Sequence, residues 1–459
     1  MNRPHEAIGA LLRQGSFSLQ QGSLSPTEAA KRFVVIEQVL SRENLNRAYQ
    51  KVVSNKGAAG VDGLSVDELK DHLRQHGVAL VGSVRDGSYQ PQPIKGVQIP
   101  KSNGKTRLLG VPTVVDRVLQ QAALQVLTPL FEVGFRPHSY GFRPGRNAHQ
   151  AVEQALAYIN EGHQHVVDID LKGFFDEVGH GKVLELVYAK VKCPQLMRLL
   201  RRMMRAPVQI EGKLHKRRKG VPQGGPLSPL LSNILLHELD RELERRGHRY
   251  VRYADDFSIY VRSKEAARRV GNSIFCFLRD KLHLPINREK SGIRRPMTFC
   301  LLGYGFVPSY RKGERGKYQL VVDKKKWATL KAELKRLTRK TVPMSFDERI
   351  QRLNWLKRGW TNYFKLASIH AKLKKMDEWV RNRLRYCIWH DWKKPEKKRK
   401  SLIRLGIEPG MAYAWSRSRM GGWRVAQSPI LGTTITVSRL KSRGYLSMLD
   451  YYHQIRSSS

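Results

Sequence analysis

The chain has 459 residues, of which 41% are hydrophobic and 27% are charged, enough for several domains with apolar cores. Its 84 Lys and Arg residues exceed its 39 Asp and Glu residues and give a formal net charge of +45, and self-repulsion on this scale disfavours compaction unless a polyanion offsets it. Nucleic acid is therefore the predicted partner, and a membrane-surface role is disfavoured because no amphipathic anchor or lipidation signal is visible.

Membrane spans and metal or disulfide frameworks are also disfavoured. No apolar run approaches the ~18 residues of a membrane span, and the N-terminal residues lack the apolar core of a signal peptide. The cysteines Cys193, Cys276, Cys300 and Cys387 are scattered without paired spacing, which argues against a zinc module and against disulfide bonds. We expect a cytoplasmic protein in a reducing compartment, with no membrane partner.

Residues 1–41 are polar and irregular, and we assign no function to them. The first clear element is a helix over Glu43–Val53, whose apolar residues form a helical stripe. A Gly-rich loop follows at Asn55–Gly63. A second helix then begins near Ser65, which precedes Glu68 by the spacing of a capping box.

Val97–Val111 predicts a β-hairpin, because two strand-like runs flank Asn103-Gly104, a dipeptide that favours a tight turn. Lys101, Lys105 and Arg107 then lie near the tip, where they could hold a triphosphate or a nucleic-acid backbone. For this hairpin alone, a solvated charged turn is the favoured alternative.

Pro112–Phe131 has apolar residues spaced for one face of a helix. A basic and aromatic loop, Ser139–Arg146, then leads into another predicted helix, Asn147–Ile159. Within the loop, Arg143 and Arg146 are candidate phosphate contacts, and the aromatic residues either stack on a ligand or pack inside the protein.

The next segment contains three aspartates, Asp168, Asp170 and Asp176. His165–Asp170 predicts a short strand, on which Asp168 and Asp170 share a face. One of these two, placed beside other carboxylates, would complete a two-metal site. Asp176 is a candidate cap for the helix that we expect to follow.

Gly220–Leu236 is a Gly- and Pro-rich turn that runs into an apolar helix, with Ser228 as candidate cap and Pro229 in the first turn. Glycines let the backbone approach a ligand closely, and a helix N-terminus favours phosphate. The alternative is a tight loop leading into a core helix, and both interpretations can hold together.

Arg249–Ser263 predicts two short strands joined by a tight turn at Ala254-Asp255-Asp256. Adjacent carboxylates repel, and each raises the pKa of the other unless a cation lies between them. Mg²⁺ would supply that charge, since it binds one or two carboxylates together with substrate phosphates. An exposed Asp-Asp turn is the alternative, which we would favour for an isolated pair but not in the company of these other motifs.

Beyond this hairpin we expect a helix at Glu265–Lys281, a strand and turn at Leu282–Lys290, and a buried strand pair at Phe299–Val307. The composition then shifts, because all eight tryptophans lie from residue 327 onward and the charges are mostly Lys and Arg.

Lys324–Thr338, Ser345–Phe364 and Leu373–Trp392 each carry a helical apolar stripe. They predict a small bundle with a basic outer face, in which most tryptophans belong to the core. Lys393–Lys400 predicts a basic linker at a domain boundary, and a short basic and aromatic segment, Ser401–Ser459, follows it.

The order of these motifs resembles that of a known family. The set IPKxxGKxR, SYGFRPGRxAH, DIDLKGFFD, GVPQGGPLSPLLSNILL, RYADDF, NxxKS and LGY is similar to the bacterial group II intron-encoded reverse transcriptase/maturase family, from about Asn44 to Tyr452. The later segments RGWTNYFK, RLRxCIWxxWK and GYLSMLDYY most resemble the class C members, which lack an endonuclease domain.

The resemblance implies roles for individual residues. Asp170 matches the first catalytic aspartate, and Asp255 and Asp256 match the YxDD pair, so that these three would hold Mg²⁺. The positions matching the family's nucleotide-binding residues are Lys101 and Arg107 at the fingertip, Phe175 as the gate against a 2′-hydroxyl, Gln223 beside the incoming base pair, and Lys290 near the pyrophosphate.

The resemblance also implies an architecture: an α/β right-hand polymerase of fingers and palm, an all-α thumb, and a small basic C-terminal nucleic-acid-binding domain. The expected divisions are an N-terminal extension at 1–41, fingers and palm at 42–310, the thumb or maturase X domain at 311–395, and a DNA-binding domain at 396–459.

The implied function is an RNA-directed DNA polymerase that is also a maturase. Its expected partners are a group II intron RNA, an RNA template with a DNA primer, target DNA and deoxynucleoside triphosphates. A domesticated enzyme of phage defence or DNA repair, without an intron, is the alternative. The candidate RNA contacts are Lys56, Arg143, Arg146, Lys393, Lys394, Lys397, Lys398, Arg399 and Lys400.

Overall fold

The computed structural model describes residues 35–100, 104, 106–310 and 312–457. They fall into two compact units, one running to Tyr158 and again from Gly162 to Arg294, the other comprising Ile159–Glu161 and the chain from Arg295 onward. The division comes earlier than the boundary expected at residue 310. Among the described helices, none combines the length and the apolar character needed to cross a membrane.

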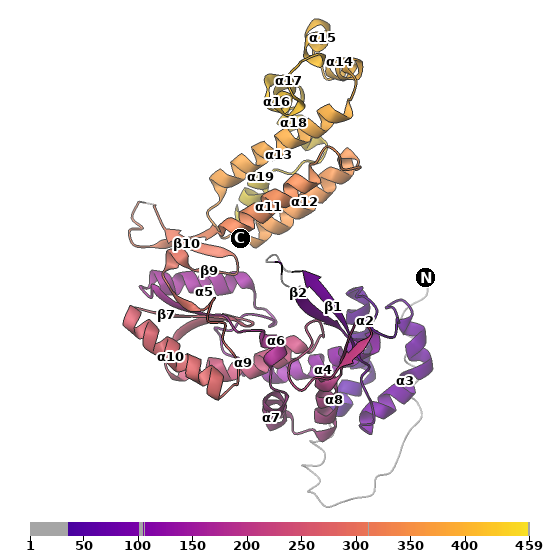
Figure 1. Ribbon diagram of the computed structural model, residues 1–459, viewed down its shortest axis with the longest axis vertical. Helices are drawn as coiled ribbons and strands as arrows, with labels where there is room; N and C mark the ends of the chain where they lie inside the picture. The colour runs from indigo at the N-terminus through magenta and orange to yellow at the C-terminus, as the bar shows by residue number, and fades with distance from the viewer. Residues whose placement is uncertain (1–34, 101–103, 105, 311, 458–459) are drawn as a thin grey trace, which may run out of the picture. The chain divides into compact units, whose positions relative to one another are not determined.

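The first unit contains a four-stranded sheet built around the predicted hairpin (Figure 1). Its strands, in the order β2-β1-β4-β5, are β2 (Thr106–Val111), β1 (Ile94–Pro100), β4 (Val208–Ile210) and β5 (Lys213–His215). The antiparallel pairing of β1 with β2 confirms the hairpin and sets Ile99 opposite Arg107. The expected tip residues Lys101 and Lys105 lie outside the described residues.

A second four-stranded sheet in this unit has the order β6-β7-β3-β8. Its strands are β6 (Arg249–Tyr253), β7 (Asp256–Val261), β3 (His165–Ile169) and β8 (Gly292–Arg294). The predicted turn is confirmed, because Tyr253 pairs with Asp256 and leaves Ala254 and Asp255 as a two-residue connection. The strand predicted at Leu282–Lys290 is largely wrong, since only an isolated bridge joins Ile286 to Leu171.

Helices pack around the second sheet and bury an apolar core with it, whereas Ile94, Ala206 and Val208 form a separate small cluster at the first sheet. The helices are α2 (Arg42–Ser54), α3 (Leu69–Arg85), α4 (Val114–Glu132), α5 (Ala148–Asn160), α6 (Phe174–Glu177), α7 (His180–Val191), α8 (Pro194–Arg205), α9 (Ser228–Arg245) and α10 (Lys264–Asp280). Ser65 and Glu68 form the predicted capping box, with the Ser65 hydroxyl 2.6 Å from Glu68 Oε2, although the regular helix begins at Leu69.

Two of the predicted caps are wrong. Asp176 lies inside the short helix α6, and the next helix, α7, begins after Gly179 without a side-chain cap. Ser228 does not cap α9, since its hydroxyl donates instead to the carbonyl oxygen of Pro222, 2.6 Å away. This bond ties the Gly- and Pro-rich turn to the first residue of the helix.

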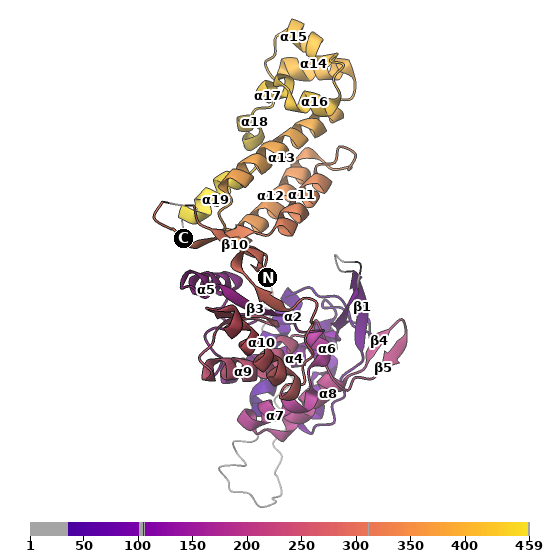
Figure 2. The same ribbon diagram turned by 60° about the vertical axis from the view of Figure 1, so that its left-hand side comes forward.

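The second unit begins with a three-stranded sheet of order β11-β10-β9, made of β11 (Tyr318–Val322), β10 (Tyr304–Pro308) and β9 (Cys300–Leu301). The pairing of β9 with β10 confirms the predicted strand pair. The three predicted helices are also confirmed as α11 (Lys324–Leu337), α12 (Phe346–Tyr363) and α13 (His370–Asp391), which lie side by side (Figure 2).

Short helices complete the second unit: α14 (Pro395–Arg404), α15 (Pro409–Ser416), α16 (Gly422–Gln427), α17 (Pro429–Thr434), α18 (Val437–Ser442) and α19 (Met448–Ser457). The linker predicted at Lys393–Lys400 is wrong, because most of it forms the start of α14 and the Lys398 ammonium lies 4.5 Å from the centre of the Trp389 ring. The last helix, α19, packs against α12 and α13.

A buried polar network joins α19 to this bundle. The Asp377 carboxylate accepts hydrogen bonds from the Tyr445 hydroxyl at 2.8 Å and from the Met448 backbone N–H at 3.0 Å. Beside it, the fully buried Lys357 donates to the carbonyl oxygen of Leu446 and lies 3.8 Å from the centre of the Tyr445 ring. Burial lowers the pKa of Lys357 to about 7, although the nearby Asp377 charge opposes this shift.

This lowered pKa makes the stability of the bundle depend on pH. Above about pH 7 the unfolded chain keeps a proton on Lys357 that the folded chain loses, so the free energy of unfolding should rise with pH by up to about 1.4 kcal/mol per unit until about pH 9.5. Urea unfolding followed by circular dichroism would measure this. In Lys357→Met the free energy of unfolding should rise less between about pH 7 and about pH 9.5. An equally steep rise in this variant would contradict the assignment.

Candidate active site

The predicted catalytic aspartates meet at the end of the second sheet. Asp255 lies in the β6–β7 turn, Asp256 begins β7, and Asp170 follows the last residue of β3. Since Ile169 pairs with Phe257, the register of β3 and β7 carries Asp170 to the position beside Asp256. Two segments far apart in the chain thus bring their carboxylates to one place.

Burial and the proximity of these carboxylates raise the pKa values of Asp255 and Asp256. Burial raises the pKa of Asp255, and the charge of Asp170 adds to the effect. Although part of Asp256 faces solvent, burial of its carboxyl group and the charges of Asp255, Asp170 and Asp168 together raise its pKa to about 6. The cluster therefore carries negative charge that nearby cations do not fully compensate, which is the condition under which a bound cation is stabilised.

Asp168 and Asp170 have different cationic partners. Asp168 forms an ion pair with Arg294 of β8, at 2.6 Å between Oδ2 and Nε. Asp170 instead lies near the predicted pyrophosphate residue, with 3.5 Å between its Oδ2 and Nζ of Lys290. The backbone N–H of Asp170 also donates to the Ser291 hydroxyl oxygen at 2.9 Å, so the turn that carries Lys290 is joined to the end of β3.

The oxygen donors of the aspartate cluster suit Mg²⁺. Among the described residues, no three His, Cys, Asp or Glu side chains converge closely enough to hold a metal by themselves. Mg²⁺ does not require such a cage, because it is commonly held by one or two carboxylates plus substrate phosphates and waters. Asp170 and Asp255, supported by Asp256, fit that requirement through their oxygen donors and shared negative charge.

A fully buried arginine holds the turn in place. The Arg252 guanidinium forms a bidentate pair with Asp240 of α9, at 2.8 Å and 2.5 Å, and donates at 2.9 Å to the carbonyl oxygen of Ala254. The same group donates to Asn233 Oδ1 at 2.9 Å. The sequence analysis missed these residues, although an arginine at a buried position of a strand was a visible signal for a buried partner.

The basic-aromatic loop packs directly on this turn. The Tyr140 backbone N–H donates to the carbonyl oxygen of Arg252 at 2.9 Å, and Asn233 Nδ2 donates to that of Gly141 at 2.9 Å. A Cβ atom on Gly141 would lie 2.3 Å from the Ala254 nitrogen. Any larger residue would therefore displace the turn that carries Asp255.

The nucleotide-binding candidates also gather in the first unit. Arg107 Nε donates to Gln223 Oε1, and the Gly110 N–H donates to the Gln223 carbonyl oxygen at 2.8 Å, which joins β2 to the Gly- and Pro-rich turn. The Val221 N–H donates to the carbonyl oxygen of Phe175 at 2.7 Å, so the proposed gate is joined to the same turn. Lys101 belongs to this set by prediction but lies outside the described residues.

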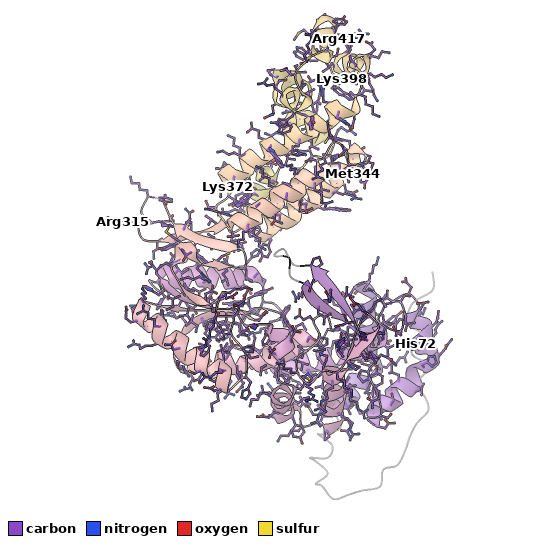
Figure 3. All side chains as sticks on the ribbon, viewed as in Figure 1. His72, Arg315, Met344, Lys372, Lys398 and Arg417 are labelled. Carbon is purple, nitrogen blue, oxygen red and sulfur yellow. The ribbon has the colours of Figure 1, made fainter. Side chains whose placement is uncertain are left out.

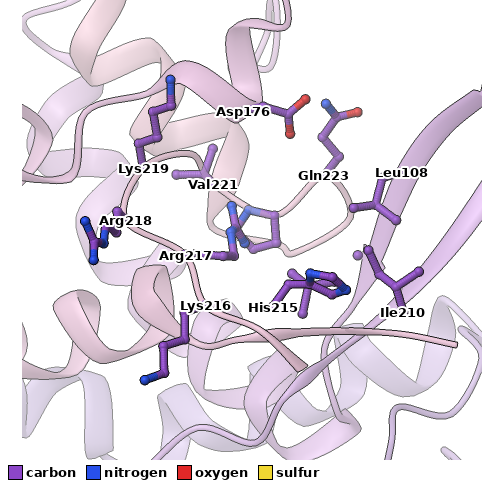
Figure 4. Close-up of a pocket in the computed structure, with 13 residues that line it drawn as sticks. Leu108, Asp176, Ile210, His215, Lys216, Arg217, Arg218, Lys219, Val221 and Gln223 are labelled. Carbon is purple, nitrogen blue, oxygen red and sulfur yellow. The ribbon is translucent and has the colours of Figure 1, made fainter. Parts of the chain in front are cut away.

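A pocket of about 460 Å³ borders these residues (Figure 4). Figure 4 shows Asp176 and Gln223 at one edge, Lys216 at the other, and Arg217 between them. Burial lowers the pKa of Arg217, and the charge of Asp176 opposes the shift. The sequence analysis did not single out this basic segment, although the run Lys216–Lys219 was a visible signal.

Among the predicted RNA contacts, Arg143 is corrected. Its side chain is 4% exposed and pairs with Glu132 at 2.7 Å. It also donates to the carbonyl oxygens of Arg136 and Ser139, both at 2.6 Å. Arg143 therefore holds its own loop and is not available to a phosphate.

The remaining RNA candidates are at the surface to different degrees. Lys56 and Arg146 are exposed in the first unit. In the second unit Lys398 covers the Trp389 ring, and Arg399 pairs with Glu396 at 2.6 Å. The fully exposed members of the C-terminal group are Lys393, Lys394, Lys397 and Lys400.

Two family models match the chain in succession. Residues 99–306 match "Reverse transcriptase (RNA-dependent DNA polymerase)". Residues 327–406 match "Group II intron, maturase-specific domain". The first match contains all three aspartates, and the second covers α12, α13, α14 and most of α11.

Curated relatives agree with these matches. The chain is 32% identical to "Protein YkfC" of Escherichia coli (strain K12) over 306 residues, 58% of this chain and 80% of that one. It is 31% identical to "Group II intron-encoded protein LtrA" of Lactococcus lactis subsp. cremoris over 332 residues, 56% of this chain and 54% of that one. The chain therefore spans about half the length of LtrA.

More distant similarity extends to other proteins. "Retron Mx65 reverse transcriptase" of Myxococcus xanthus is 32% identical over 208 residues, 43% of this chain and 47% of that one. Among solved structures, a "Partial Cas6-RT-Cas1--Cas2 complex" aligns with a TM-score of 0.36 and 22% identity over 59% of this chain and 46% of that one. That structural likeness is too low to support a conclusion.

The raised pKa of Asp256 predicts pH-dependent cation binding. Below its pKa of about 6, a proton competes with the ion, so Mg²⁺ affinity should rise with pH between about 5 and about 7, approaching tenfold per unit if one proton is displaced. Calorimetric titration of the nucleic-acid-free protein would measure this. Asp71→Asn removes a carboxylate that is 73% exposed on α3 and should not alter the result, whereas a pH-independent affinity would contradict the assignment.

Proposed function

Because this chain belongs to the family of group II intron-encoded reverse transcriptases and maturases, we propose that it copies RNA into DNA and also binds its intron RNA to assist splicing. The observation that carries the polymerase assignment is the convergence of Asp170, Asp255 and Asp256 at the end of one sheet. In this proposal the first unit provides fingers and palm, and the bundle of the second unit is the thumb.

The residues of the chain divide the work of nucleotide addition. Asp170, Asp255 and Asp256 would hold Mg²⁺, which when bound stabilises the charge of the reacting phosphates and lowers the pKa of the attacking 3′-hydroxyl. Arg107 binds the triphosphate of an incoming deoxynucleotide through its guanidinium fork. Its Nε donates to Gln223 Oε1, so the two residues are positioned together.

Positioning residues support this chemistry. Arg252 holds the carbonyl oxygen of Ala254 and thereby orients Asp255 next to it. Lys290, 3.5 Å from Asp170, would bind the leaving pyrophosphate through its ammonium group. The substrates in this proposal are an RNA template with a DNA primer and deoxynucleoside triphosphates, with target DNA supplying the primer during intron mobility.

The maturase half of the proposal rests on charge and on the second family match. The net charge of +45 greatly exceeds what one catalytic cleft uses. A folded RNA presents a large phosphate surface that proteins bind through basic patches and aromatic side chains. We assign that surface to Lys56 and Arg146 in the first unit and to the exposed lysines Lys393, Lys394, Lys397 and Lys400 in the second unit.

Polymerisation and intron binding should separate by mutation. Asp255→Ala should abolish primer extension on an RNA template while sparing intron affinity, because it removes a carboxylate and no phosphate contact. The control Asp280→Ala removes an exposed carboxylate paired with Arg279 and should extend primers normally. Extension by the Asp255 variant at more than a trace would refute the site.

The complementary variant reverses charge at Lys394, Lys397 and Lys400, which are exposed. It should weaken intron binding and splicing assistance while retaining extension of a generic primer-template. Filter binding at several salt concentrations would measure affinity, and the dependence on salt should become shallower because fewer phosphates are neutralised. Normal splicing by this variant would contradict the assignment of the surface.

Sugar selection tests the placement of Phe175. Its ring is half-buried and packs edge-to-face on Phe174, with 5.5 Å between the ring centres, so it has little freedom to move away from a 2′-hydroxyl. Phe175→Val should raise ribonucleotide incorporation relative to deoxyribonucleotide by at least about tenfold, equivalent to about 1.4 kcal/mol. Single-nucleotide incorporation kinetics give this ratio. The control Tyr188→Val alters a residue that is 43% exposed on α7 and should leave the incorporation ratio unchanged. An unchanged ratio in Phe175→Val would place the gate elsewhere.

A further inference from the structure

A groove between α11 and α13 combines basic and aromatic side chains. It has a volume of about 440 Å³. Its lining residues are Lys324, Trp327 and Lys331 from α11, and Lys372, Lys375, Met376 and Trp379 from α13. Among these described lining residues no side chain is acidic. We call this feature the lysine–tryptophan groove, and Lys372, near the start of α13, is labelled in Figure 3.

Helical spacing explains how the groove is built. Trp327 and Lys331 are four residues apart on α11, and Lys372 and Trp379 are seven apart on α13, so each helix presents its members on one face. Inner-face residues such as Leu334 are fully buried in the bundle. The lysines of the groove are exposed, whereas both tryptophans are only half-buried.

The two helices exchange cation–π contacts across the groove. Lys331 of α11 places its Nζ 5.5 Å from the centre of the Trp379 ring on α13. Lys372 of α13 places its Nζ 5.6 Å from the centre of the Trp327 ring on α11. Such contacts are weak at exposed sites, and a lysine side chain is long and mobile. Each ammonium group can therefore leave its ring when an anion binds, and a planar ligand can take its place. The Trp379 ring keeps a second cation when Lys331 leaves, because the Arg383 guanidinium lies 5.4 Å from the ring centre.

The ligand that satisfies both features is a nucleotide. Its phosphate would attract the ammonium groups, and its base would stack on the indole rings that they leave. A duplex does not fit this chemistry, because its bases are already stacked on one another and their faces are hidden. The Trp327 ring also packs on Trp360, with 4.6 Å between ring centres, which gives the stacking surface a rigid support.

We propose that the lysine–tryptophan groove binds an unpaired nucleotide of RNA, with its base on Trp327 and Trp379 and the flanking phosphates on the groove lysines. The choice of RNA rests on the proposed function, because nearly all of the groove lies within residues 327–406, the match to the maturase-specific domain. The groove is distinct from the lysines assigned above to the intron surface and adds a site that reads an unstacked base.

The test uses the full chain and its intrinsic tryptophan fluorescence. A short single-stranded oligoadenylate should quench the emission, whereas a blunt RNA duplex of equal length should quench it weakly. Trp379→Phe should remove part of the quenching. Trp355→Phe is the matched control, because Trp355 is 64% exposed on α12 and does not line the groove, and it should leave the quenching by the oligoadenylate in place.

Affinity variants separate stacking from charge. Trp379→Leu keeps an apolar side chain but loses the stacking surface, and should weaken oligoadenylate binding about tenfold. Lys372→Gln should lower the slope of log affinity against log salt by about 0.7, whereas Lys374→Gln, an exposed lysine of α13 outside the groove, should change it less. Circular dichroism would verify that each variant is folded.

Three outcomes would overturn the proposal. Full affinity in Trp379→Leu would remove the stacking role, equal quenching by the duplex would leave only phosphate attraction, and equal affinity for the matching oligodeoxyadenylate would refute the choice of RNA. Failure of the proposed function is distinguishable, because primer extension and splicing are measured separately. Asp255→Ala should retain the quenching even though it cannot extend a primer.

Discussion

The buried ion pair between Arg252 and Asp240 is the interaction on which the candidate active site depends. Both side chains are fully buried in the pair, so neither charge has water to stabilise it if the other is lost. Removing one partner of such a pair costs about 3–5 kcal/mol, because an uncompensated charge remains inside the protein. The guanidinium also donates to Asn233 Oδ1 and to the carbonyl oxygen of Ala254. Ala254 is the residue before Asp255, so these bonds hold the aspartate turn in place.

This network also explains why three distant motifs act as one. Ala254 has a φ of +57°, a conformation that a residue with a side chain adopts only when its surroundings hold it there. Arg252 holds it from the core, and Gly141 leaves room for the backbone on the outside. Asn233 joins the two by accepting from Arg252 and donating to Gly141. The loop, α9 and the turn therefore form one support for Asp255.

The charges of the molecule have opposite signs at two scales. The whole chain carries +45, whereas the aspartate cluster is locally negative enough to raise the pKa of Asp256 to about 6. The aspartate cluster is stabilised by a cation, and the protein as a whole attracts polyanions. A ligand that brings phosphates together with divalent ions satisfies both requirements. Lys290 and Arg294 moderate the cluster without neutralising it, since each contacts a different aspartate.

The sequence by itself determined the local elements and pointed to the carboxylates that we propose as catalytic. The hairpins, α4, α5 and the bundle helices α11 to α13 were predictable because the period of apolar residues is set within each element. The resemblance of the ordered motifs located Asp170, Asp255 and Asp256, and the register of β3 and β7 brings them together.

Tertiary structure alone decided which partners the polar and basic residues have. Asp168 was a candidate ligand until it paired with Arg294, 126 residues further along the chain. The pairing of Arg143 with Glu132, the burial of Arg252 beside Asp240, and the packing of α19 on α12 and α13 likewise join separate elements. The sequence does not show whether a charged side chain faces water or a buried partner, because its solvation depends on neighbours that only the folded chain supplies.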